Sequence, residues 1–138
     1  MANEKSFNLN DASVSPAAIA LPASASTSIV TASIDLNAVG PFTAPCELEI
    51  SAPALGATPL PNGETMIYDV QDSADDSTFA DVASALITQT GAGGAGDAAE
   101  VERYRLPSTI RRYVLVQATS SGSAGDASGS NLTVKLLF

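Results

Sequence analysis

Short apolar runs alternate with clusters of turn-forming residues along most of this chain, and this pattern constrains the fold more than any other feature. The clearest run is PCELEISA, in which Cys46, Leu48 and Ile50 alternate with Glu47 and Glu49. Successive side chains of a β-strand point to opposite faces, so the three apolar residues share one face and the two glutamates share the other. The run therefore predicts a strand with one buried and one solvated face.

Runs of the same kind recur along the chain, separated by Gly, Pro, Ser, Asn and Asp clusters that favour turns. In TSIVTASIDL, for example, the alternation places Val30, Ala32, Ile34 and Leu36 on one face. Short antiparallel strands with long irregular connections predict an all-β fold, namely a jelly-roll-like sandwich of about eight strands with an N-terminal extended arm. The seven predicted strands, with an eighth near the N-terminus, are 27–36, 45–52, 64–71, 78–89, 98–106, 110–119, 131–138 and 5–11.

The segment before Pro107 has two interpretations. Asp97 could cap a short helix whose first turn holds Ala98, Ala99 and Glu100, and the proline would then end it. We favour a strand over 98–106, because Val101, Tyr104 and the two arginines alternate well in a pleat.

The first 26 residues differ in composition from the rest. Residues 12–26 are rich in Ala, Ser and Pro and nearly free of charge. They form either a flexible leader or an extended arm that becomes ordered against a neighbouring subunit. The predicted division is therefore an arm or leader over 1–26 and a β-sandwich domain over 27–138.

Composition excludes several classes of function. The net charge is −9, and nucleic-acid binding needs Lys and Arg to neutralise phosphates, so we expect neither nucleic acid nor a membrane as partner. The chain has no His, which removes imidazole acid–base chemistry and histidine metal ligation. The sequence therefore predicts a protein that is not an enzyme. The lone Cys46 is in phase with two apolar neighbours and is interpreted as a core residue.

YDVQDSADDST holds four aspartates within eight positions. An EF-hand type calcium loop starting at Asp72 would need an oxygen ligand at Ala74, a Gly at Ser77 and a Glu at Ala83, so the spacing fails. A different cation site built from Asp72, Asp75 and Asp76 remains an alternative. We favour a solvated turn between two strands, with aspartates that cap turn amides.

The string GAGGAG at 91–96 matches the glycine fingerprint of dinucleotide-binding folds. That fold needs a long helix after the glycines and an acidic residue about 20 positions further on. Pro107 comes too early for such a helix, and the region around Val116 has no acid. The string is interpreted as a flexible hairpin loop.

Positive charge is concentrated near the C-terminus. Residues 1–100 hold 13 acidic residues and one basic residue, whereas residues 101–138 hold two acidic and five basic residues. If 98–106 and 110–119 form a hairpin around LPST, several arginines gather at one end of the sandwich. They either pair with the protein's own carboxylates or form a docking patch for an acidic partner.

The order of these features resembles the small capsid decoration, or cement, proteins of tailed bacteriophages that have a jelly-roll fold. The resemblance covers most of residues 27–138 and depends on V-Q-x-S-x-D-x-x-x-F at 70–79 and R-R-Y-V at 111–114. It implies a structural virion protein on the outer capsid surface, made in the host cytoplasm. Such proteins bridge major capsid protein subunits as dimers or trimers and use no cofactor and no catalysis.

The family offers no catalytic or metal-binding residues, so contact residues are inferred from charge and exposure. The candidates for contact with the capsid or with another subunit are Phe7, Leu9, Arg103, Arg105, Arg111 and Arg112. Two other functions remain open: a carbohydrate-binding or adhesin-like jelly-roll module, and a head-fibre or tail accessory protein. Scarce aromatic residues count against sugar binding, since the chain has no Trp and three Tyr.

Overall fold

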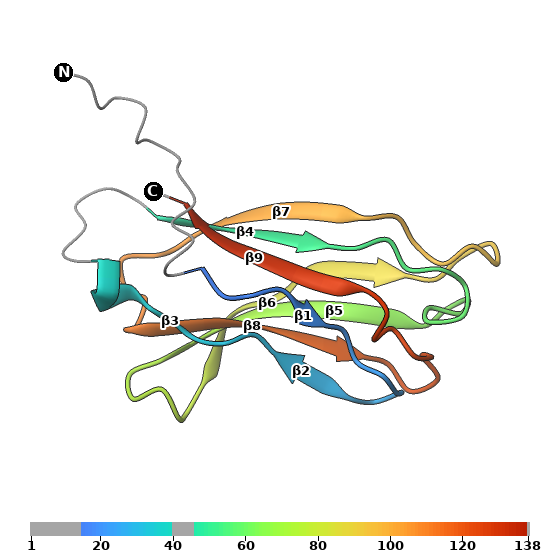
Figure 1. The fold of residues 1–138 in the computed structure, drawn as a ribbon, viewed down its shortest axis with the longest axis horizontal. Coiled ribbons are helices and arrows are strands. Elements are labelled where there is room, and N and C mark those ends of the chain that lie inside the picture. The colour runs from blue at the N-terminus through green and yellow to red at the C-terminus, as the bar shows by residue number, and fades with distance from the viewer. Residues whose placement is uncertain (1–14, 40–45, 138) are drawn as a thin grey trace, which may run out of the picture.

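The computed structural model describes residues 15–39 and 46–137 of the chain. These residues form two antiparallel β-sheets packed face to face (Figure 1). The first sheet has the order β1-β9-β4-β7, and the second has β2-β8-β5-β6 with β3 also pairing with β8. The strands are β1 (Ile19–Ala20), β2 (Ser28–Val30), β3 (Ile34–Asp35), β4 (Glu47–Ala52), β5 (Thr65–Ser73), β6 (Ala80–Thr90), β7 (Glu100–Arg105), β8 (Tyr113–Ser120) and β9 (Asn131–Leu137), and a 3-10 helix, η2, spans Leu36–Val39.

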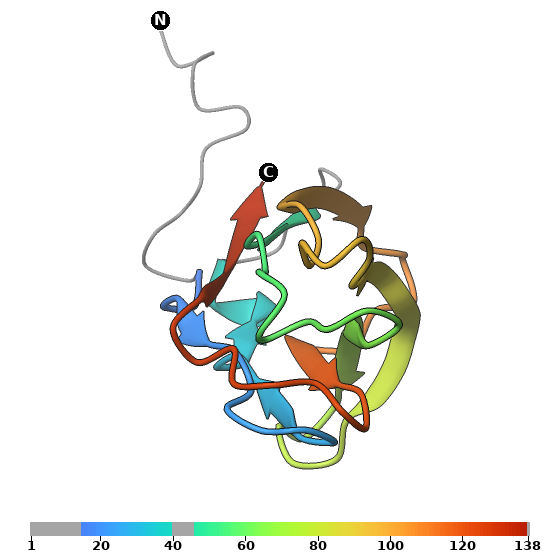
Figure 2. The same cartoon turned by 90° about the vertical axis from the view of Figure 1, so that its right-hand side faces the viewer.

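The strand pairs are nested in the order of the chain. β5 pairs with β6, β4 with β7, β2 and β3 with β8, and β1 with β9, and successive pairs alternate between the two sheets. A double-sheet fold wound from four nested antiparallel pairs is a jelly roll. The predicted all-β, jelly-roll-like sandwich is therefore confirmed. Figure 2 views the two layers from one end.

The core lies between the sheets and is built by the alternation that the sequence displays. Leu48 and Ile50 on β4 are fully buried, and Glu47 and Glu49 lie on the outer face, as predicted. Burying each such aliphatic side chain contributes about 1.5–3 kcal/mol to folding. The largest buried side chains of the core are Tyr68, Leu21, Ile34, Leu48, Ile50, Leu55, Leu60, Met66, Ile87, Leu132, Leu136 and Gln89.

The predicted strand 27–36 is divided into β2 and β3 by an interruption at Thr31. The buried Thr31 hydroxyl accepts a hydrogen bond from the Val116 backbone N–H at 3.1 Å. Ile29 faces the core before this break and Ile34 faces it afterwards, so the inward-facing positions change from odd-numbered to even-numbered residues. The prediction that Val30 shares the buried face with Ile34 is therefore wrong, and Val30 is 44% exposed.

Residues 98–106 contain strand β7 rather than a helix, so the favoured interpretation of this segment is confirmed. The predicted eighth strand at 5–11 lies outside the described residues.

Part of the predicted arm packs against the sandwich. β1 pairs with β9, and Leu21, just after β1, is buried and donates a backbone hydrogen bond to Ser130 at 3.0 Å. Further along, the Ala127 N–H donates to the Pro22 carbonyl at 2.9 Å. The sandwich therefore begins before residue 27.

The glycine-rich loop carries the chain from β6 in the second sheet to β7 in the first, so it is not a hairpin between paired strands. Leu55 and Asp97 form an isolated antiparallel bridge at the end of this loop. Gly96 has a φ of +79°, and a Cβ atom there would collide with the Leu55 carbonyl. The close approach of the two backbones therefore requires glycine at this position.

A buried polar network joins the two sheets. The Gln89 side chain, on β6, donates hydrogen bonds to the carbonyls of Pro53 at 2.8 Å and Ala98 at 2.7 Å. It accepts one from the Tyr68 hydroxyl at 2.9 Å. Burial raises the pKa of Tyr68, so this residue remains a neutral donor. Both the oxygen and the nitrogen of the Gln89 amide therefore have hydrogen-bond partners.

Replacing Tyr68 with Phe should leave the buried Gln89 carbonyl without a donor. We expect a loss of about 1–2 kcal/mol in the free energy of unfolding, measured by urea denaturation. Tyr104→Phe is the matched control, since its hydroxyl makes only a long 3.5 Å contact with the Val82 carbonyl. Equal losses in the two variants would contradict the network's role.

Candidate functional site

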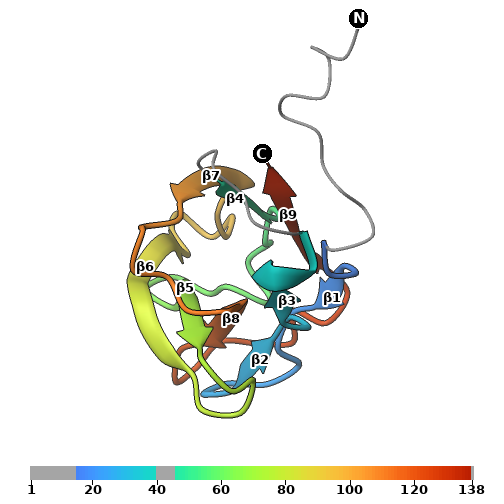
Figure 3. The same ribbon diagram turned by 90° about the vertical axis from the view of Figure 1, so that its left-hand side faces the viewer.

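A hollow of about 660 Å³ lies at the end of the sandwich where β3 runs into η2 and where the chain crosses from β7 to β8. Its walls combine apolar side chains with three guanidinium groups. Figure 3 views the molecule from this end. The lining residues are Leu36, Asn37, Cys46, Arg105, Leu106, Pro107, Ser108, Ile110, Arg111 and Arg112.

The LPST segment brings the arginines together by a different route from the predicted hairpin. β7 pairs with β4, whereas β8 pairs with strands of the other sheet, so the hairpin prediction is wrong. The segment instead crosses between the sheets at the hollow. Arg105 comes just before this crossing, and Arg111 and Arg112 come just after it.

Arg111 is tied to a carboxylate inside the fold. Its Nε donates to Asp72 Oδ1 at 2.6 Å, its backbone N–H donates to Asp72 Oδ2 at 2.8 Å, and a terminal nitrogen donates to the Asp72 carbonyl at 2.7 Å. Asp72 is only 3% exposed, so this contact neutralises a buried charge at the end of β5. The pairing of Asp72 with Arg111 was not predicted from the sequence, because the two residues are 39 positions apart.

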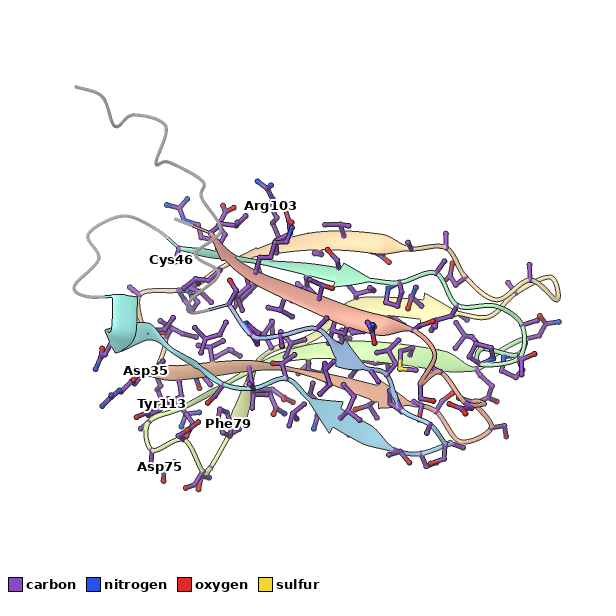
Figure 4. All side chains as sticks on the ribbon, in the orientation of Figure 1. Asp35, Cys46, Asp75, Phe79, Arg103 and Tyr113 are labelled. Carbon is purple, nitrogen blue, oxygen red and sulfur yellow. The ribbon has the colours of Figure 1, made fainter. Side chains whose placement is uncertain are left out.

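Arg112 forms a bidentate ion pair with Asp35 at the end of β3. Nε and a terminal nitrogen donate to the two carboxylate oxygens at 2.9 and 2.8 Å, and the guanidinium lies 4.9 Å from the centre of the Tyr113 ring. The hydrogen bond from Arg112 lowers the pKa of Asp35. Figure 4 shows Asp35 and Tyr113 at this end of the molecule.

Arg103 and Arg105 lie on the outer face of β7 and differ in their partners. Arg103 donates to Glu49 Oε2 through Nε at 3.0 Å and through a terminal nitrogen at 2.9 Å. Arg105 lies opposite Glu47 in the ladder, but within the described residues it has no carboxylate within ion-pair distance. Among the four candidate arginines, Arg105 is therefore the one without an ion pair in the part of the chain that the structure describes.

Cys46 closes the apolar floor of the hollow. Its side chain is 3% exposed, and burial raises the pKa of its thiol. The interpretation of Cys46 as a core residue is confirmed. Cys46 lines the hollow together with Leu36, Leu106 and Ile110, and this apolar surface was not predicted from the sequence. The apolar residues on either side of residues 107–109 were a signal that could have indicated it. Phe7 and Leu9, the other two contact candidates, lie outside the described residues.

The four aspartates of YDVQDSADDST have separate structural roles. Asp69 and Asp72 lie within β5 rather than in the turn, so the interpretation of all four as a solvated turn is wrong for these two. Asp69 accepts a hydrogen bond at 2.6 Å from the N–H of Ala85, which has a positive φ of 52° at an irregularity in the β5–β6 pairing. Asp75 and Asp76 are exposed in the turn, as predicted.

Asp75 organises this turn. One carboxylate oxygen accepts hydrogen bonds from the Ser77 N–H at 3.0 Å, the Thr78 N–H at 2.9 Å and the Ser73 hydroxyl at 2.8 Å. These bonds, led by the one from Thr78, hold the pKa of Asp75 well below its ordinary value. In residues 15–39 and 46–137 no group of three or more His, Cys, Asp or Glu side chains is placed to hold a metal ion.

The chain has no match among the protein-family models, and none among the curated proteins. Within the described residues no helix is long and apolar enough to cross a membrane.

Arg111→Ala should destabilise the fold, because it leaves the buried Asp72 carboxylate unpaired. We expect a loss of about 3 kcal/mol, the lower end of the range for a broken buried pair, since the Arg111 side chain is 40% exposed. Arg105→Ala is the control and should change stability by less than about 0.5 kcal/mol. Denaturant unfolding of both variants measures the difference, and similar stabilities would refute the assignment.

Asp75→Asn should weaken the fold at neutral pH and have little effect in acid. The lowered pKa of Asp75 means that its contribution is present above the ordinary carboxyl pKa and is lost as the pH falls through the lower folded-state value. The difference in melting temperature between wild type and variant should therefore shrink below about pH 4. A difference independent of pH would show that the charge of Asp75 has no role in the turn.

Proposed function

We propose that this chain is a structural virion protein that binds the outside of a phage capsid and stabilises the shell by bridging major capsid protein subunits. The protein would be made in the host cytoplasm, would act on the outer capsid surface without a cofactor or catalysis, and would use another copy of itself as a further partner. The observation that carries the proposal is the arginine-rimmed hollow, with Arg105 left unpaired by the described carboxylates, at one end of a strongly acidic protein.

The electrostatics favour binding in one orientation. A protein with a net charge of −9 is repelled by acidic surfaces on most of its faces, so an acidic partner is best approached through the hollow. Arg111 and Arg112 already have carboxylate partners at this rim, which leaves Arg105 as the residue that gains most from an outside carboxylate. Many such contacts repeated by symmetry on a shell would add through avidity.

The fold is compatible with a structural role. A jelly roll offers stable sheets, and its loops and edges are available for contacts without any catalytic group. The motifs 70–79 and 111–114, which carry the resemblance to capsid decoration proteins, meet in space, because Asp72 in the first binds Arg111 in the second.

Arg105→Glu should lower binding to purified heads of the encoding phage by about tenfold or more, because it places a negative charge against an acidic partner surface. Lys135→Glu is the matched control, since it changes the net charge equally but lies on β9, away from the lining of the hollow. Sedimentation of heads with bound protein measures occupancy. Equal occupancy by wild type and Arg105→Glu would contradict docking through the hollow.

Copy number tests the wider proposal. Mass spectrometry of purified virions should find the chain in a fixed, high ratio to the major capsid protein. A few copies per virion would instead support a head-fibre or tail accessory protein. Calcium-dependent binding to a glycan array would support a carbohydrate-binding module and contradict the capsid role.

A further inference from the structure

β7 is an edge strand with an open side. It pairs with β4 alone and ends the first sheet. The Leu106 N–H donates to the Cys46 carbonyl at 3.0 Å, so the alternation of an antiparallel ladder directs the backbone groups of Tyr104 and Glu102 toward β4 as well. The N–H and C=O groups of Val101, Arg103 and Arg105 therefore point away from β4, where no described strand pairs with them.

The side chains of β7 form two rows. Glu100, Glu102 and Tyr104 lie opposite Ala52, Ile50 and Leu48, whose side chains are buried between the sheets, so this row is on the inner face. Even so, Glu100 and Glu102 are exposed, because the inner face is uncovered at this edge. The outer row holds Val101, which is 59% exposed, with Arg103 and Arg105.

Pairing of β7 with β7 of a second copy is unfavourable. Two antiparallel copies related by a two-fold axis must pair residues of the same row, since directly opposite side chains share a face. Every such register centred between Val101 and Tyr104 places Glu opposite Glu or Arg opposite Arg. Like charges directly opposite each other destabilise a ladder, so β7 of a second copy is a poor partner for this edge.

The N-terminal sequence fits the inner row. In KSFNL, Lys5, Phe7 and Leu9 alternate with polar residues, and in a parallel strand they run in the order basic, aromatic, aliphatic. The inner row of β7, continued past its end, runs acidic, aromatic, aliphatic through Glu102, Tyr104 and Leu106. Phe7 would also cover Val82 and Leu86 of β6, half-buried side chains at the margin of the core. Figure 3 shows β6 and β7 together on one side of the sandwich.

The length of the chain favours a second copy as donor. Ser15 accepts a hydrogen bond from the Leu136 N–H at 3.1 Å, on the side of β9 that faces β1. From there to a strand added beyond β7 is four strand spacings, about 19 Å. The six steps from Leu9 to Ser15 reach at most about 22 Å when fully extended, so the same molecule could reach only along a nearly straight path. A neighbouring molecule has no such restriction.

We infer that the free edge of β7 receives residues 5–9 of a second copy of this chain as an added parallel strand, with Lys5 beside Glu102, Phe7 beside Tyr104 and Leu9 beside Leu106. The arm of each copy completes the sheet of another, so the interface is made by exchange. It does not depend on the capsid, and its failure would leave capsid binding intact and bear only on the self-association part of the proposed function.

Proline at position 103 tests the edge. The Arg103 N–H points away from β4, so Arg103→Pro spares the existing ladder and blocks the added one. Arg103→Ala is the matched control, because it loses the same ion pair with Glu49 but keeps the N–H. Analytical ultracentrifugation of the full chain should show self-association of wild type and Arg103→Ala, and association at least about tenfold weaker for Arg103→Pro. A monomeric wild type, or equal association of the two variants, would overturn the inference.

Mixing two defective variants tests the donor. A chain lacking residues 1–11 keeps the edge but loses the strand, whereas Arg103→Pro keeps the strand but loses the edge. Each should be monomeric alone, and an equimolar mixture should form a heterodimer. Self-association of the truncated chain, or no heterodimer, would overturn the inference.

Charge reversal tests the register without any change to the backbone. Lys5→Glu should weaken association by placing like charges together, and the double variant Lys5→Glu/Glu102→Lys should restore it. Glu100→Lys in place of Glu102→Lys is the control and should restore less. Equal rescue at both positions, or none, would contradict the proposed register. Far-UV circular dichroism and melting temperatures check that each variant is folded.

Discussion

A polar contact around the fully buried Gln89 connects the two sheets within a mostly apolar core. Gln89 extends from β6 to carbonyls next to β4 and β7, and Tyr68 satisfies its remaining atom. An apolar side chain at position 89 would remove the donor to both carbonyls and leave the buried Tyr68 hydroxyl without its acceptor, so the amide links the second sheet to the first. The close backbone bridge between Leu55 and Asp97, which requires Gly96, lies in the same region and depends on the same alignment.

The opposite end of the sandwich is organised by charge. Asp72 is buried at the end of β5, and its carboxylate accepts hydrogen bonds from the guanidinium and the backbone N–H of Arg111. This pair fixes the start of the chain segment that leads into β8, and Arg112 then reaches Asp35 beside η2. The charges of these two arginines are compensated by Asp72 and Asp35. Their main role in the hollow is therefore to form its wall. Arg105 forms no ion pair with a carboxylate of residues 15–39 or 46–137, so it differs from Arg111 and Arg112 in this part of the chain.

The alternation of apolar and polar residues was enough to predict most strands and the sandwich, because each sheet has one face in the core. The same rule misplaced Val30, since a local hydrogen bond from Val116 to the Thr31 hydroxyl breaks the strand and moves the row by one residue. It also could not pair the strands. β7 and β8 are adjacent in sequence and lie in different sheets, because the nested winding of the whole chain determines their partners. The ion pair between Asp72 and Arg111 also depends on that winding, so it could not be predicted from the sequence.

The order of charges in β7, which reads EVERYR, limits which strands can pair with its free edge. An edge strand exposes backbone groups that can pair with any extended chain, and proteins limit this with charges. In β7 the acidic residues lie on one face and the basic residues on the other, so two identical edges related by a two-fold axis oppose like charges in every register centred between Val101 and Tyr104. The same arrangement leaves the edge open to a strand that carries a basic residue toward the core. The charges on β7 therefore disfavour pairing with a second β7, and the added strand that we infer is one that these charges would accept.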